Sequence, residues 1–197
     1  MPKQKEQFEE MRLQTIQKLQ KAGLKLFAQK GLAATNIKEI AKEAQVSLGL
    51  LYHYYSSKEE LYLSLANEAM EKSRLLAEQM NQLEGSVGDK LSLFVEAFLN
   101  GVQKEDGIYY FIIISQLFET GNPEADRQLL DKKRQAIENL ARLVEQGQKD
   151  GECVEGDPFQ LAAALISATQ GIASFRLMFG EGFGLPDKSI LLRILTK

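Results

Sequence analysis

The sequence predicts an all-α protein. Only four prolines occur in the 197 residues, and three of them fall where breaks between helices are expected. No Asn-Gly or Asp-Gly pair is flanked by alternating apolar runs, so Asp106-Gly107 and Asp150-Gly151 are interpreted as turns that end helices rather than as hairpins. The β-prone run 109–114 has no partner strand elsewhere, and it is therefore assigned to a buried helix.

A long first helix is predicted over about residues 6–30. Its apolar residues recur at spacings of three and four, which places them on one face, and Gly31 ends the helix. The residues of this face are Ile16, Leu19, Gly23, Leu26 and Phe27.

Two short helices and a longer one follow. The first short helix, over 36–44, comes after Thr35 and turns Ile37, Ile40, Ala41 and Ala44 inward. Ser47 caps the second short helix, which reaches about Tyr55. Ser57 opens the longer helix as a capping box, because Glu60 lies three residues further on.

The rest of the chain also reads as helix. The long helix that Ser57 opens runs to about Met80, and Glu84, Gly85 and Gly88 form a loop after it. Further helices are predicted at about 88–104, 108–119, 123–149, 157–179 and 187–195. We expect two domains, one over residues 1–56 and one over residues 57–197.

Composition and charge limit the classes of function that the chain can have. The net charge of −3 hides a division, since residues 1–70 carry 10 Lys and Arg against 8 Asp and Glu, whereas residues 71–197 carry 14 against 19. This allows a local footprint for nucleic acid. One cysteine and one histidine leave no metal-ligand cluster and no acid-base constellation, so neither an enzyme nor a cofactor is expected. No segment is expected to span a membrane, no signal peptide is seen, and a cytoplasmic location is predicted.

The two short helices after a longer one form a helix-turn-helix pattern. Leu51 and Tyr55 lie four residues apart and can face the core, so the other apolar and ring-bearing side chains of this short helix point elsewhere. Such exposure on so short a helix indicates a contact surface. Gly49 inside the helix costs about 1 kcal/mol relative to Ala, which a close approach of another backbone would justify.

These residues carry a resemblance to a known family. Fixed spacings join Gly31, Ala34-Thr35, Ile37-x-x-Ile40-Ala41, Val46-Ser47-x-Gly49-x-Leu51-Tyr52 and Ser57-Lys58-Glu59-x-Leu61. This pattern, over about residues 10–65, resembles the tetracycline-repressor (TetR/AcrR) family of bacterial transcription regulators. The resemblance implies a homodimeric, ligand-responsive protein that binds a double-stranded DNA operator, usually as a repressor.

The resemblance also assigns roles to residues. Recognition-helix positions that face DNA match Ser47, Leu48, Gly49, Leu50, Tyr52, His53 and Tyr54, and phosphate-contact positions match Thr35 and Lys58. Two departures stand out. The turn glycine of the family is Gln45 here, and Leu48 and Leu50 replace residues that are often polar, so base recognition would depend more on methyl contacts and DNA shape.

The predicted second domain is expected to hold an effector pocket and a dimer seam. A small, largely apolar effector is expected against Phe94, Phe98, Tyr109, Tyr110, Ile113, Phe118, Leu165 and Phe175, with Gln116, Glu119 and Gln170 orienting it. The seam is expected to involve Ala163, Ile166, Gln170, Gly171, Ser174, Ile190, Leu191 and Ile194. For most of these residues ordinary core packing is an open alternative.

Three other functions stay open at this point. The chain could be a helical small-molecule-binding protein of the same fold without DNA binding, since Gln45, Leu48 and Leu50 depart from the family pattern. It could be a regulator with no small-molecule ligand. An enzyme on a helical bundle is disfavoured by the missing acid-base groups.

Overall fold

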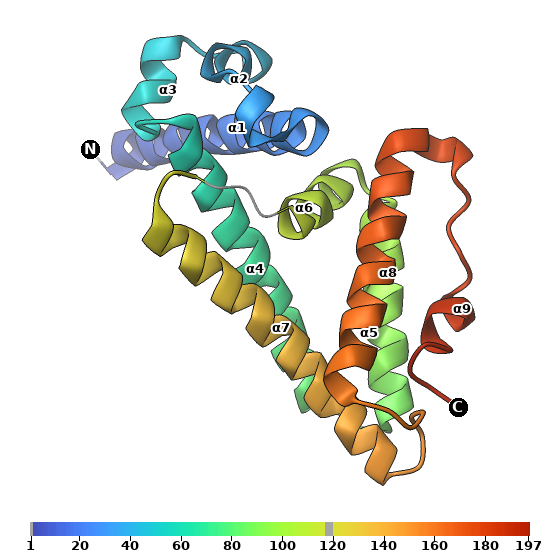
Figure 1. The fold of residues 1–197 in the computed structure, drawn as a ribbon. Helices are drawn as coiled ribbons and strands as arrows, with labels where there is room; N and C mark the ends of the chain where they lie inside the picture. The colour runs from blue at the N-terminus through green and yellow to red at the C-terminus, as the bar shows by residue number, and fades with distance from the viewer. Residues whose placement is uncertain (1, 117–119) are drawn as a thin grey trace.

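The structure is a computed structural model that describes residues 2–116 and 120–197. Within these residues it is built of α-helices with one short 3-10 turn, and it contains no named β-strand (Figure 1). The elements are α1 (Pro2–Ala34), α2 (Ile37–Glu43), α3 (Leu48–Tyr54), α4 (Lys58–Gln82), α5 (Val87–Val102), α6 (Glu105–Ser115), α7 (Pro123–Lys149), α8 (Pro158–Phe179), η1 (Gly180–Gly182) and α9 (Lys188–Leu192). The predicted all-α fold is thereby confirmed.

Helices α1, α2 and α3 lie together at one end of the molecule, and α4 runs from them toward the other end beside α7 (Figure 1). Helix α8 packs against α7 and α6, and α5 packs against α9. Helix α6 contacts α1, α4, α5 and α8, so it joins the N-terminal helices to the rest of the chain. The predicted boundary between residues 56 and 57 coincides with the start of α4, and the division into domains stays a prediction.

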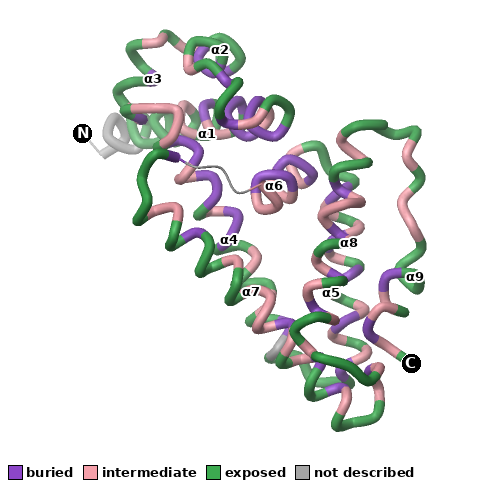
Figure 2. The backbone as a smooth tube through the Cα atoms, in the orientation of Figure 1, coloured by how far each residue is buried: buried purple, intermediate pink, exposed green. Residues whose placement is uncertain are grey.

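Burial is uneven along the chain. Figure 2 shows buried stretches along α1, the first half of α4 and α6. By contrast, residues 71–79 of α4 are half-buried or exposed, and much of α7 is exposed as well. The core is therefore dense near the N-terminal helices and more open between α4 and α7.

Side-chain caps define most of the helix starts. Asn36 and Ser86 form reciprocal capping boxes with Glu39 and Asp89. Ser57 accepts a hydrogen bond from the backbone N–H of Glu60 as predicted. The predicted capping box at Ser57 is half right, because the Glu60 carboxylate reaches past Ser57 and accepts from the N–H and hydroxyl of Ser56, at 2.7 and 2.6 Å.

Two predicted turns need correction. Asp106-Gly107 lies in the first turn of α6 instead of ending a helix. Acidic residues at a helix start favour this arrangement, and a Cβ on Gly107 would lie 2.2 Å from the carbonyl oxygen of Gly101, so glycine lets α5 and α6 approach closely. Gly88 belongs to the first turn of α5 rather than to the preceding loop. The turns at Gly31 and Asp150-Gly151 are as predicted, with φ values of 78° and 77° at the two glycines.

Candidate nucleic-acid interface and effector cavity

Helices α2 and α3 form the predicted helix-turn-helix. Ile40 and Ala41 of α2 are buried against Leu51 of α3, and the turn closes with a 3.0 Å hydrogen bond from the N–H of Val46 to the carbonyl of Ala41. Gln45 occupies this turn at φ 56°, and it is the one non-glycine residue with positive φ in the described chain. A residue other than glycine therefore holds a left-handed backbone conformation in this turn.

The outward face of α3 is apolar and aromatic. Leu50 is 38% exposed and Tyr52 is 50% exposed, while Gly49 and His53 are also exposed. A Cβ on Gly49 would meet no described atom of this chain within 4 Å, so nothing inside the molecule explains a glycine there. These four residues lie where a contact surface is predicted.

Three further residues of the predicted surface lie differently. Leu48 and Tyr54 are half-buried and pack against the core, so only part of each side chain faces outward. Ser47 is exposed and caps α3 by accepting a 3.1 Å hydrogen bond from the N–H of Leu50. Its hydroxyl fixes where the helix begins, which is the role that a serine at this position has in any helix.

Thr35 does not present a hydroxyl to solvent. Its side chain is 2% exposed and donates to the carbonyl of Gly31 at 2.7 Å, with a longer contact of 3.3 Å to Leu26. The predicted phosphate contact through this hydroxyl has no support in the geometry. The hydroxyl instead satisfies a carbonyl that Gly31 leaves unpaired where α1 departs from helical geometry.

Lys58 binds the end of α1. Its ammonium donates to the carbonyls of Leu32, Ala33 and Thr35, at 2.8, 3.1 and 2.9 Å. A cation at a helix C-terminus is favourable, because the free carbonyls there carry partial negative charge. The first residue of α4 is thus tied to the last turn of α1, and a phosphate contact by Lys58 would require these bonds to be given up.

Two other lysines of this region are less constrained. Lys25 and Lys30 pair with Glu43 and Glu39 of α2, whereas Lys38 and Lys42 are exposed and form no ion pair with the described residues. Sequence reasoning treats such lysines as solvated, because a single lysine on a helix surface carries no distinguishing pattern.

A cavity of about 790 Å³ lies between α4, α5, α6, α7 and α8. Four of the residues predicted to contact an effector line it, namely Phe94, Phe98, Tyr110 and Gln170. Phe111 of α6, Met70 of α4 and Ile137 of α7 also line it and were not predicted. No spacing in the sequence ties α4 or α7 to a cavity, and in α6 the neighbouring Tyr109 and Tyr110 were chosen instead of Phe111.

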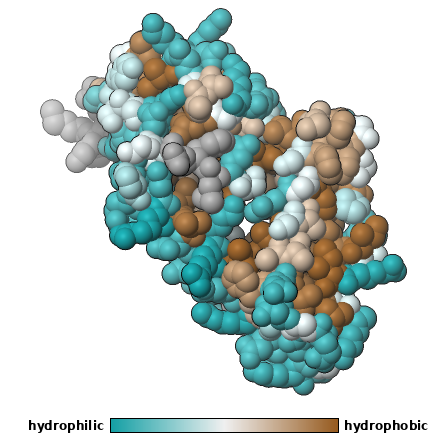
Figure 3. Space-filling model, in the orientation of Figure 1, coloured by the Kyte–Doolittle hydropathy of each residue, from teal (hydrophilic) through white to brown (hydrophobic). Residues whose placement is uncertain are grey.

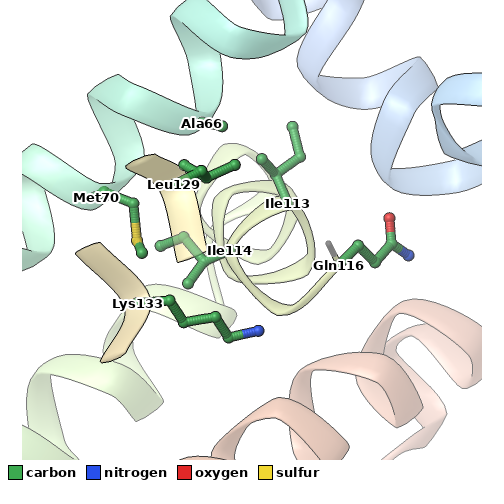
Figure 4. A pocket seen from close by; sticks show the side chains of 7 residues that line it. All are labelled: Ala66, Met70, Ile113, Ile114, Gln116, Leu129 and Lys133. Carbon is green, nitrogen blue, oxygen red and sulfur yellow. The ribbon is translucent and has the colours of Figure 1, made fainter. Parts of the chain in front are cut away.

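The remaining predicted effector residues do not line this cavity. Tyr109 faces α1, where its hydroxyl lies 3.5 Å from the side-chain nitrogen of Gln29. Leu165 is fully buried in the core, and Phe175 lies on the outside of α8. Ile113 and Gln116 line a separate small recess (Figure 4), and Phe118 and Glu119 lie outside the described residues.

A second apolar surface covers the outside of α8. Figure 3 shows hydrophobic side chains gathered over the part of the molecule that contains α8. Gly171 and Ser174 of the predicted seam lie on this side, with no described atom within 4 Å of a Cβ on Gly171. The exposed apolar residues of this region are Phe159, Phe175, Met178, Phe179 and Ile190.

The predicted seam is only partly in place. Ile166 and Gln170 line the cavity, and Leu191 is buried within the chain, while their place in the seam stays a prediction. Residues of α8 that are close in sequence can differ in surroundings, because the turn of the helix points some toward the cavity and others toward the outside. Ala163 and Ile194 are half-buried.

Helix α8 also passes a test for a membrane span. Contrary to the sequence expectation, the segment Pro158–Gly182 is long and apolar enough to cross a membrane by length and composition, and 22% of its most apolar window is buried in the chain. A core helix of a globular protein meets the same criterion, and α8 packs against α7, α6 and α5. By itself the criterion is weak evidence for a span.

The fold and the exposed α3 define a helix-turn-helix protein with a helical body. In comparison with known protein families, residues 19–65 match the model of the bacterial regulatory proteins of the tetR family. Over these residues the chain is similar to that family of transcriptional regulators, and the similarities below extend the likeness of fold to the helical body.

Two curated relatives and one solved structure illustrate the similarity. The uncharacterized HTH-type transcriptional regulator YuxN of Bacillus subtilis is 52% identical over 50 residues, which are 25% of this chain and 17% of that protein. The fatty acid metabolism regulator protein of the same organism is 25% identical over 149 residues, 75% of each chain. AibR, solved in complex with isovaleryl coenzyme A and operator DNA, aligns with a TM-score of 0.71 over 91% of this chain and 94% of its own, at 16% identity.

Proposed function

We propose that this chain is a homodimeric repressor that binds a palindromic DNA operator through α3 and is released by a small, largely apolar effector. The observation that carries the proposal is the exposed face of α3. Leu50 and Tyr52 are held outward by a helix whose inner residue, Leu51, is completely buried. A short helix with a rigid base and an apolar outer face fits the major groove, where leucine and tyrosine carbon can press on thymine methyl groups.

The α8 surface supports the dimer. Two recognition helices can enter successive major grooves only if two copies are held at a fixed separation. An isologous contact through the outside of α8 would cover the apolar side chains of Phe175, Met178 and Phe179. The same contact accounts for an apolar helix in a regulator that we expect in the cytoplasm.

The cavity supports an effector. Its volume of about 790 Å³ falls in the range of ligand sites, roughly 300–1,000 Å³. AibR was solved with an acyl coenzyme A and operator DNA together, and a curated relative is named for fatty acid metabolism. Helix α6 lies between the cavity and α1, with Tyr110 on the cavity side and Tyr109 against α1, so a ligand there can shift the N-terminal helices. Effector affinity and DNA affinity are then reciprocally coupled.

Selection of bound sequences from a random pool of double-stranded DNA tests the proposal. We expect purified full-length protein, at a stated salt concentration, to enrich a palindrome. Leu50→Ala should lose the enriched sequence, whereas Leu83→Ala, at the far end of α4 and similarly exposed, should keep it. No enrichment at low salt, with the protein folded, would contradict DNA binding and favour a ligand-binding protein of the same fold.

A further inference from the structure

Five basic residues line the cavity, and four of them have a side-chain partner. Lys72 pairs with Glu68 at 2.7 Å, and Arg74 pairs with Glu71 and Glu78. The other two donate to amide oxygens, Lys132 to Asn67 at 2.6 Å and Arg142 to Asn139 at 3.4 Å. These four positive charges lie in exposed positions at the rim of the cavity.

Lys133 is the exception. Its ammonium donates to one acceptor, the backbone carbonyl of Ser115 at 3.1 Å, and no carboxylate of the described residues pairs with it. An ammonium has three donors, so two of them have no protein acceptor in the described chain. The side chain is half-buried, and burial lowers the pKa of its amine. A desolvated cation without a counter-charge is costly, and folded proteins seldom keep one without a use for it.

The surroundings of Lys133 are apolar. A recess of about 10 Å³, the space of a single water, is lined by Lys133, Gln116 and the apolar residues Ala66, Met70, Ile113, Ile114 and Leu129 (Figure 4). Met70, Ile114 and Lys133 border both this recess and the large cavity. The side-chain oxygen of Gln116 is buried without a hydrogen-bond partner in the described chain. An ammonium with spare donors and an amide oxygen without a partner thus lie beside the apolar residues of this recess.

We propose that the cavity binds an amphipathic monoanion, with a carboxylate head at the Lys133 ammonium and an apolar body against Phe94, Phe98 and Phe111. This inference rests on the proposed function, because it names the chemical class of the effector. A head with a single charge fits better than a phosphate-rich one. The cations at the rim are already engaged by protein side chains, so one ammonium is left to hold the ligand.

Matched pairs of ligands test the proposal directly. Octanoate and 1-octanol share an aliphatic body, and 2-naphthoate and 2-naphthol share an aromatic one. Calorimetric titration of full-length protein at one pH is expected to show at least one acid bound about 10- to 100-fold more tightly than its alcohol, the usual gain from a charge-assisted hydrogen bond. Lys133→Met should reduce the preference to less than about 3-fold, and Lys133→Arg should retain it.

A neighbouring lysine of the cavity provides the control. Lys132→Met removes a neighbouring cation of the same cavity, and it should leave the preference intact because Lys132 is held by Asn67. Equal affinity for acid and alcohol, a preference that survives Lys133→Met, or no binding of either acid at millimolar concentration would each overturn the proposal. Thermal unfolding without ligand checks the fold, and the melting temperature of Lys133→Met should be unchanged or about 2 °C higher.

Titration without DNA separates this inference from the proposed function. A protein that enriches an operator but binds neither acid remains a DNA-binding regulator with a different effector or none. A protein that binds an acid through Lys133 but enriches no DNA sequence retains the ligand site and loses the regulator function.

Discussion

The N-terminal helices and the helical body differ in where function lies relative to packing. In α1–α3 the core is closed: Leu19, Phe27, Ile40 and Leu51 are fully buried, and the proposed DNA surface lies outside it. In the body the proposed effector site lies within the helical packing, where the second half of α4 and α7 leave a cavity. In α3 the side chains most central to folding and to the proposed binding, Leu51 and Leu50, are therefore different residues, whereas a residue of the body can serve both.

Two adjacent leucines give the largest test of this difference. Leu51 is 0% exposed, and Leu51→Ala should destabilise the protein by about 2–5 kcal/mol, because it leaves a cavity in a closed core. Leu50→Ala should leave stability within about 0.5 kcal/mol of the original. It should weaken operator binding by up to about 60-fold, since as many as three buried carbons, at about 0.8 kcal/mol each, are lost from the DNA contact. Denaturant unfolding and DNA titration measure the two effects.

Lys58 tests whether one residue can serve both purposes. Its three hydrogen bonds to α1 carbonyls predict that Lys58→Met costs about 1–3 kcal/mol of stability. The slope of log affinity against log salt should not change, because the ammonium is engaged within the protein. A slope smaller by about 0.9, without loss of stability, would instead place Lys58 on a phosphate.

Two glycines in helices should respond in opposite directions to alanine. Gly107→Ala would bring a Cβ to 2.2 Å from the Gly101 carbonyl and should cost about 1–3 kcal/mol. Gly49→Ala meets no described atom of this chain, and it should stabilise α3 by about 0.5–1 kcal/mol.

DNA binding then reports why Gly49 is a glycine. If a DNA backbone or base edge approaches α3 at this position, the more stable Gly49→Ala variant binds the operator more weakly. Unchanged affinity would show that no close contact is made there, and it would move the interface toward Tyr52 and His53.

Sequence patterns predicted the N-terminal helices almost completely, because local chemistry determines them. Ser47 caps α3 and Gly31 ends a helix as predicted, whereas Asn36, predicted as the first residue of its helix, is the residue that caps it. Thr35 and Lys58 were assigned to phosphate by resemblance and by their places at helix N-termini. Their bonds to α1 depend on how three helices meet, which no local pattern encodes.

In the body, the helices were predictable, but the sequence identified only part of the cavity lining. The apolar spacing of α8 marks it as buried on one side, but does not say that Ile166 faces the cavity while Gly171 faces outward. Lys133 lies within a basic run, residues 132–134, in the acidic part of the chain, which predicts a solvated face. Only the folded structure shows that its ammonium reaches the carbonyl of Ser115 at the end of α6.

The smallest expected effect concerns the turn between α2 and α3. A left-handed residue other than glycine costs about 1–2 kcal/mol, so replacing it with glycine relieves this strain. Part of the relief is offset, because glycine gives the unfolded chain more conformational freedom to lose on folding. Gln45→Gly should therefore raise the melting temperature by about 1–3 °C. Gln45→Ala is the control, because it removes the side chain and keeps the strained φ of 56°. An equal rise in both variants would trace the effect to the glutamine side chain, whereas a rise in Gln45→Gly alone would show that the turn backbone carries the strain.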